Sequence, residues 1–222
     1  YKNRSNPVFI TEFTSKNSLC DIICFERQHI KYAGWDSTKK LINVYGIASG
    51  MKYLHSKGIL HRNLRPSNII LDNFLCPKLS DFGVCNHLLI MNSITFKSNS
   101  KIKSSSYYQA PEVLNSEDYT EESDVYSFAM VAYEILTNDQ PFSEIRDFSK
   151  LYREVVVKGS RPKFRKPIAD CYRNLIECCW CQNPNDRLTF DQIVDVLQNE
   201  RDFVTPEINQ NEYYKYVDRD LL

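Results

Sequence analysis

The chain has 222 residues, of which 42% are hydrophobic and 25% charged, a composition typical of one large globular domain. Its 28 basic and 28 acidic residues cancel, so charge favours neither nucleic acid nor a membrane surface as a partner. No apolar run is long enough to span a membrane and no secretory signal opens the chain, so we expect a cytoplasmic, intracellular protein. In that setting the eight cysteines indicate reduced thiols.

The first part of the chain contains one predicted strand and two predicted helices. An apolar run over residues 8–13 predicts a buried strand. A short apolar stretch over residues 19–25 predicts a helix. A longer helix is expected over residues 37–56, with Ser37 as its N-cap, because apolar residues recur there at helical spacing.

The middle of the chain contains two predicted strands followed by a polar segment. Two short apolar runs, residues 69–71 and 77–79, are separated by the turn signal Asp72-Asn73 and predict a two-stranded ribbon. Residues 84–109 are rich in Ser, Asn and Lys, a composition that suits a mobile surface segment. The ribbon therefore ends in a long polar connection.

The last part of the chain is predicted to be helical. Residues 121–136 are apolar nearly all round, which indicates a helix buried in the core. Further helices are expected at about 146–157, 170–181 and 189–199. A few strands followed only by helices indicate an α+β fold. Residues 203–222 are polar on average, contain Tyr213, Tyr214 and Tyr216, and predict a loosely held C-terminal tail, with a docking motif as the alternative.

Three motifs occur in a fixed order, accompanied by two further polar positions. The motifs are His61-Arg62-Asn63-Leu64-Arg65-Pro66-Ser67-Asn68, Asp81-Phe82-Gly83 and Ala110-Pro111-Glu112, and the positions are Asp124 and Arg187. This set resembles the protein-kinase family over roughly residues 1–200, and the nearest group is the tyrosine-kinase-like Ser/Thr kinases. The resemblance implies a protein-kinase-like α+β fold. Residues 1–202 would then be a partial kinase domain, with an N-lobe remnant and hinge at 1–14, a mainly helical C-lobe at 15–202, and the tail after it.

The same resemblance implies ATP and Mg²⁺ as cofactors and a protein as substrate or partner. Asp81 and Asn68 would hold the metal, because Mg²⁺ prefers carboxylate and carbonyl oxygens, and both would also be catalytic. The residues that would bind the nucleotide are Thr11 at the gatekeeper position, the main chains of Glu12 and Thr14 in the hinge, and Ile70. An ordinary strand and turn is the alternative interpretation of residues 1–14.

Further residues would have structural or regulatory roles by the same resemblance. His61 would pack under the catalytic loop, residues 61–68, near Phe82. Asp124 would anchor the same loop. Arg62 would bind a phosphorylated activation loop, because its planar fork suits phosphate; a surface ion pair is the alternative. The Ser105 hydroxyl would contact the catalytic loop. Glu112 and Arg187 would form a buried ion pair. The candidate phosphosites are Ser93, Thr95, Ser98 and Ser104 to Ser106.

The sequence departs from the family pattern at three points. Asn63 stands where the family has its catalytic Asp, and an amide cannot take up a proton at neutral pH. Arg65 stands where Ser/Thr kinases usually have Lys, a swap of a compact charge for a longer, planar one. No Gly-rich G-x-G-x-x-G loop occurs. With Tyr1 and not Met at the start, we expect a fragment of a longer kinase-like protein.

These departures leave competing hypotheses about function. The first is an inactive pseudokinase that acts by binding partners or nucleotide. The second is a weak but real kinase that transfers the ATP γ-phosphate to protein Ser or Thr, impaired by Asn63. A third treats residues 1–222 only as a protein-interaction lobe.

A cysteine cluster near the C-terminus has two interpretations. Cys178-x-x-Cys181, with Cys171 and Cys179 nearby, has a spacing found in metal sites. No second pair follows at zinc spacing, and the histidines stop at His87. We therefore favour buried thiols in a helical core.

Overall fold

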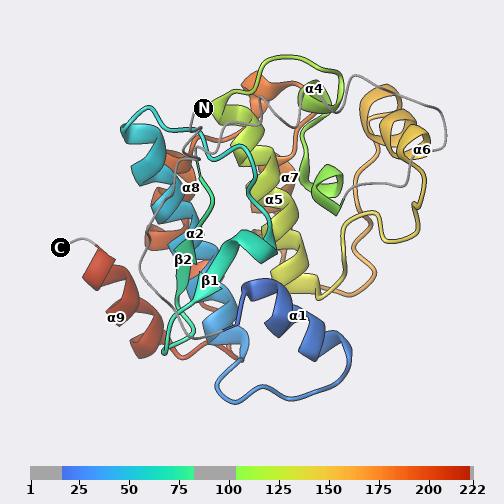
Figure 1. The fold of residues 1–222 in the computed structure, drawn as a ribbon. Coiled ribbons are helices and arrows are strands. Elements are labelled where there is room, and N and C mark those ends of the chain that lie inside the picture. The colour runs from blue at the N-terminus through green and yellow to red at the C-terminus, as the bar shows by residue number, and fades with distance from the viewer. Residues whose placement is uncertain (1–16, 83–103, 221–222) are drawn as a thin grey trace, which may run out of the picture.

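The computed structural model describes residues 17–82 and 104–220. Within these ranges it is mainly helical, with one small sheet (Figure 1). No helix in the described part is long and apolar enough to cross a membrane. In chain order the helices and strands are α1 (Leu19–Arg27), α2 (Ser37–Ser56), β1 (Ile69–Leu71), β2 (Pro77–Leu79), α4 (Pro111–Leu114), α5 (Glu121–Thr137), α6 (Phe148–Tyr152), α7 (Asp170–Cys179), α8 (Phe190–Asn199) and α9 (Gln210–Asp220).

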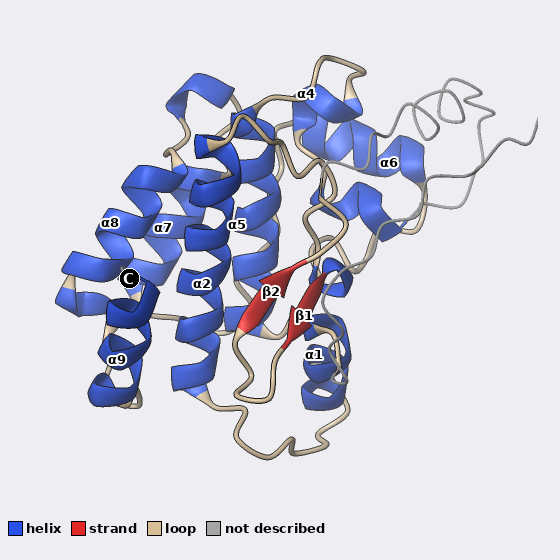
Figure 2. Ribbon diagram, turned by 60° about the vertical axis from the view of Figure 1, so that its left-hand side comes forward, coloured by secondary structure: helices blue, strands red, loops and turns tan. Residues whose placement is uncertain are grey.

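Helices α2 and α5 form the centre of the fold. Figure 2 shows α2 between the strands on one side and α8 and α9 on the other, with α5 packed behind it. Every residue of α5 from Ser123 to Ile135 is buried, which confirms the predicted core helix. Since both helices are long and anchored along their length, the loops that leave their ends have rigid supports.

Local side-chain chemistry sets where the helices begin and end. Ser18 and Asp21 form a reciprocal capping box at the start of α1. The N-cap of α2 is Asp36, whose carboxylate accepts from the amide of Lys39, so the prediction of Ser37 as N-cap was wrong by one residue. Asn138 ends α5 in the left-handed conformation, at φ 59°, which Asn tolerates.

The predicted ribbon is confirmed as an antiparallel pair. Ile69 lies opposite Leu79 and Leu71 opposite Pro77. Ile70 also makes a bridge to Ser18, just before α1. The hairpin therefore joins α1 to the residues that lead into Asp81.

Two predicted helices differ in extent from the structure. The segment expected at 146–157 begins as the short α6 and continues as a π-helical turn over Arg153–Val157. Helix α7 ends at Cys179, two residues earlier than expected. The predicted strand over 8–13, the hinge, and the polar segment up to residue 103 lie outside the described residues.

The prediction that residues 203–222 form a loosely held tail is wrong for the described part, 203–220. Helix α9 packs against α2, with Tyr213 and Val217 buried. These two residues are four apart and share one helical face, so a polar average composition hides a short apolar stripe. Lys39 of α2 also pairs with Glu212 over 2.6 Å.

The cysteine prediction holds for only one of its residues. Cys179 is buried, whereas Cys178 is exposed and both Cys171 and Cys181 are half-buried. Among the described residues, no group of three or more His, Cys, Asp or Glu side chains is placed to hold a metal.

Candidate functional site

The loop over residues 61–68 is fastened to the core by one buried carboxylate. Asp124, in the first turn of α5, accepts hydrogen bonds from the backbone amides of His61 (2.8 Å) and Arg62 (2.9 Å). Its Oδ2 also lies 3.0 Å from Nε2 of His55, near the end of α2. Arg62 has a φ of 65°, a conformation that costs energy and needs such support. Asp124 thus joins α2, α5 and the loop.

The His61 ring is fully buried beside the exposed ring of Phe82, with the centroids 6.4 Å apart and the planes at 71°. Neither ring nitrogen of His61 has a hydrogen-bond partner among the described residues. Burial lowers the pKa of this imidazole, against the opposing charges of Asp124 and Asp81. His61 is therefore held as a neutral ring.

Asn68 is the polar centre of the loop. Its side-chain Nδ2 donates to the backbone oxygen of Asn63 over 2.8 Å, and its Oδ1 accepts from the Ser67 hydroxyl over 3.2 Å. The Asn68 backbone oxygen accepts from the amide (2.9 Å) and the hydroxyl (3.0 Å) of Ser80. Because Asp81 directly follows Ser80, these bonds bring the predicted metal-binding residues of the two motifs to one place.

Asp81 is exposed and has a φ of 55°. The left-handed backbone is uncommon for a residue with a side chain, and such conformations concentrate at functional sites. Its carboxylate and the Asn68 amide oxygen are hard oxygen donors, so the donor set present here fits Mg²⁺.

Arg65 joins the loop to the segment in front of α4. Its Nε donates to the Ser67 hydroxyl over 2.6 Å, and one terminal nitrogen donates to the Ser104 hydroxyl over 3.1 Å. The described contact between the loop and this segment is thus made by Ser104, whereas the sequence pattern pointed to Ser105, which is half-buried.

Only some of the other predicted nucleotide-binding residues and phosphosites lie in the part of the chain that the structure describes. Ile70 is half-buried on β1, opposite Lys78. Ser104 is exposed and Ser106 buried. Those that lie outside the described residues are Thr11, Glu12, Thr14, Ser93, Thr95 and Ser98.

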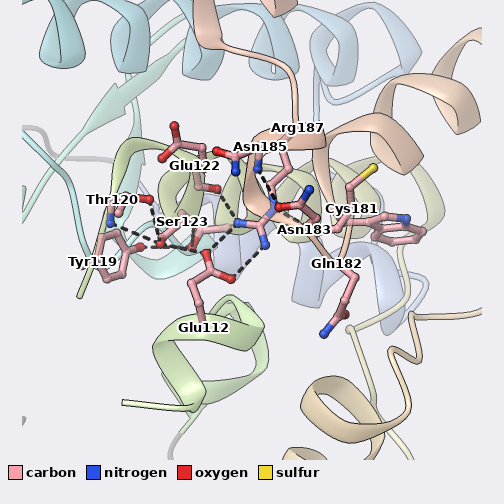
Figure 3. Close-up of polar contacts among 12 residues, drawn as sticks. Glu112, Tyr119, Thr120, Glu122, Ser123, Cys181, Gln182, Asn183, Asn185 and Arg187 are labelled. Atoms are coloured by element: carbon pink, nitrogen blue, oxygen red, sulfur yellow. Dashed lines mark hydrogen bonds and ion pairs between the residues drawn. The ribbon is translucent and has the colours of Figure 1, made fainter. Parts of the chain in front are cut away.

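Glu112 and Arg187 form the bidentate ion pair drawn in Figure 3. The two guanidinium nitrogens lie 2.7 and 2.9 Å from the carboxylate oxygens. The Ser123 hydroxyl donates to Glu112 as well, and Arg187 donates from Nε to the backbone oxygen of Cys181. Burial alone would raise the pKa of Glu112, but the hydrogen bonds and charge of Arg187 hold it below its usual range.

A second buried carboxylate was missed by the sequence analysis. Glu134 of α5 accepts from the Tyr108 hydroxyl over 2.5 Å and from Arg27 of α1 over 2.6 Å. Burial raises the pKa of Glu134, while Tyr108 and Arg27 oppose that rise. A lone carboxylate within the apolar stretch 128–136 of this core helix was the available signal, since such a group requires buried partners.

The chain is similar to known proteins along most of its length. A family model described as protein tyrosine and serine/threonine kinase matches residues 1–197. A probable serine/threonine-protein kinase of Dictyostelium discoideum is 32% identical over 197 residues, which is 86% of this chain and 14% of that protein. Dual specificity protein kinase shkC of the same organism is 34% identical over 171 residues, 76% of this chain and 33% of that protein.

A plant protein extends the match further along the chain. Serine/threonine-protein kinase STY17 of Arabidopsis thaliana is 30% identical over 211 residues, 95% of this chain and 34% of that protein. The chain thus spans between 14% and 34% of the length of these three relatives.

Proposed function

The chain belongs to the protein kinase family, and from that premise we propose that the protein is an intracellular Ser/Thr kinase in signalling with impaired catalysis. The reaction is transfer of the ATP γ-phosphate to a Ser or Thr hydroxyl of a protein substrate. The observation that carries the proposal is a loop geometry built around Asn68 and Asp81, with an amide at position 63 in place of a base.

Asn68 and Asp81 are the residues that would hold Mg²⁺. The bond from the Asn68 side-chain nitrogen to Asn63 leaves its amide oxygen on the other side, where Ser67 donates to it. The exposed Asp81 carboxylate supplies the negative charge. Mg²⁺ held there would neutralise charge on the transferring phosphoryl group; such neutralisation, together with positioning, is the main contribution that a protein makes to this reaction.

Asn63 accounts for the impairment. Its amide oxygen can accept a hydrogen bond from the substrate hydroxyl and orient it, but it cannot take the proton. General-base help is worth about 10²–10⁴-fold, so loss of the base slows the reaction without abolishing it. Positioning and charge neutralisation contribute more to the rate; the Asn63 amide retains its part in positioning, and charge neutralisation does not depend on this side chain.

Arg65 supports a second candidate function, a pseudokinase that acts as a scaffold. Its guanidinium is engaged with Ser67 and Ser104, and not held open toward a phosphate. A planar cation that fastens the loop to the segment before α4 stabilises one arrangement of a binding surface. Partner binding is then the whole function, and this scaffold has given up its nucleotide.

Mg²⁺-dependent ATP binding distinguishes the two candidates. The experiment is a thermal shift on the full-length natural protein, with ATP alone, with Mg²⁺-ATP, and with both in the Asp81→Ala variant. A kinase predicts a rise in Tm that needs Mg²⁺ and is lost in the variant, because only a ligand bound to the folded state stabilises it. No shift at millimolar ATP would contradict the kinase proposal and favour the scaffold.

A further inference from the structure

The Cys178-x-x-Cys181 motif lies at the end of α7, away from the loop over residues 61–68. Cys178 is exposed in the last turn of the helix, and Cys181 is half-buried two residues past its end. Cys179 points the other way and is fully buried, so only the first and last thiols of the motif are accessible.

The Cys181 sulfur folds back over the last turn of α7. It lies 3.5 Å from the backbone oxygen of Glu177, the residue immediately before Cys178. In Figure 3 this sulfur points away from Arg187 and Glu112. Burial raises the pKa of the Cys178 thiol, and the neighbouring Cys181 raises it further.

The backbone geometry suits a disulfide between these residues. Helical positions three apart have Cα atoms about 5 Å apart, from a rise of 1.5 Å and a radius of 2.3 Å. Disulfides span Cα separations of about 4.4–6.8 Å. Trp180, the residue between the helix end and Cys181, has φ −108° and ψ 23°, which keeps the chain turning in the helical sense.

We propose that Cys178 and Cys181 are a dithiol modification site that closes reversibly to an intramolecular disulfide. With oxidised glutathione as the oxidant, one cysteine thiolate attacks a sulfur of the reagent and releases one reduced glutathione. The second cysteine then attacks the mixed disulfide and releases another. Two protein thiols lose their hydrogens, two electrons pass to the oxidant, and two reduced glutathione molecules form.

Closure acts on the segment that positions Arg187. The Cys181 backbone oxygen accepts from Arg187 (2.9 Å), and the Trp180 backbone oxygen accepts from Arg161 (2.7 Å). The disulfide replaces the contact of the Cys181 sulfur to Glu177 with a covalent bond to Cys178, the next residue in the chain. The oxidised form therefore fixes the backbone that carries both arginine contacts.

The test is oxidation of the full chain with excess oxidised glutathione, followed by alkylation in denaturant, tryptic digestion and mass spectrometry. Cleavage after Arg173 and Arg187 yields one peptide, 174–187, which contains Cys178, Cys179 and Cys181 but not Cys171. We expect this peptide to lose two hydrogens, to carry one alkylated cysteine at position 179, and to recover fully with dithiothreitol.

Matched variants assign the bond. Cys178→Ser and Cys181→Ser should each abolish the two-hydrogen loss, whereas Cys171→Ser on the same helix should leave it unchanged. In a Trp35→Phe background the remaining indole, Trp180, reports on closure, and its fluorescence should fall on oxidation and return on reduction. The proposal is overturned by a stable glutathione adduct at Cys178, by a bond that includes Cys179, or by three alkylated cysteines after oxidation.

Discussion

The side chain of Asn68 donates to the backbone oxygen of Asn63 over 2.8 Å, so within the described part of the chain the loop is held through the main chain of residue 63. The missing carboxylate therefore leaves the scaffold of the loop intact. The side chain at position 63 can therefore be changed without disturbing Asn68 and Asp81, the residues proposed to hold the metal.

Restoring the carboxylate should raise activity. Asn63→Asp supplies the general base and keeps the backbone contact to Asn68, so we expect phosphorylation of a generic protein substrate to rise by about 10²–10⁴-fold in the full-length protein. The measurement is initial rate with radiolabelled ATP. Asp81→Ala in the same background is the control and should remove the gain; an unchanged rate would contradict impairment by Asn63.

Removing Arg187 should destabilise the fold strongly. Arg187→Leu leaves the Glu112 carboxylate buried without its cation, which costs about 3–5 kcal/mol in the free energy of unfolding. Urea unfolding measures the change. Arg165→Leu is the matched control, since the pair of Arg165 with Glu144 is more than half exposed on both sides and is worth at most about 1 kcal/mol. Equal losses would refute the special role of the buried pair.

The buried His61 should make stability fall in mild acid. Its folded-state pKa lies below the ordinary value of 6.5, so as pH falls the unfolded chain binds the proton first. Stability from this residue is present above pH 6.5 and declines below it, by at most about 1.4 kcal/mol per pH unit. Unfolding curves across that range should show a shallower decline for His61→Leu; identical slopes would exclude His61 as the source.

Adding a methyl group at Gly46 should loosen the contact between α2 and α9. A Cβ there would clash with the Tyr216 hydroxyl and lie 2.7 Å from Cγ of Pro77 on β2. Gly46→Ala should cost about 1–3 kcal/mol, the range for overpacking, and thermal unfolding measures it.

A second glycine in the same helix supplies the control. Gly50→Ala meets only the end of the Leu79 side chain, at 3.0 Å, which can move aside. It should therefore cost less than Gly46→Ala, and a larger loss at Gly50 would contradict the close approach of α9.

The sequence alone determined the family and most of the elements. The order of the motifs identified the kinase resemblance, and helical and strand periodicities located α2, α5 and the hairpin within a residue or two. These features are local, since caps, turns and apolar spacing act within a few residues. The pairing of Glu112 with Arg187, 75 positions apart, came from the family pattern and not from spacing.

Only the tertiary structure decided where polar atoms find partners across the chain. It placed Arg65 against Ser104, joined Glu134 to Tyr108 and Arg27, and packed α9 onto Gly46. Each contact depends on which faces of distant elements meet, and a sequence pattern does not encode that directly. The same reason applies to the cysteine motif, because burial of one thiol and exposure of its neighbour follow from how α7 lies on the core.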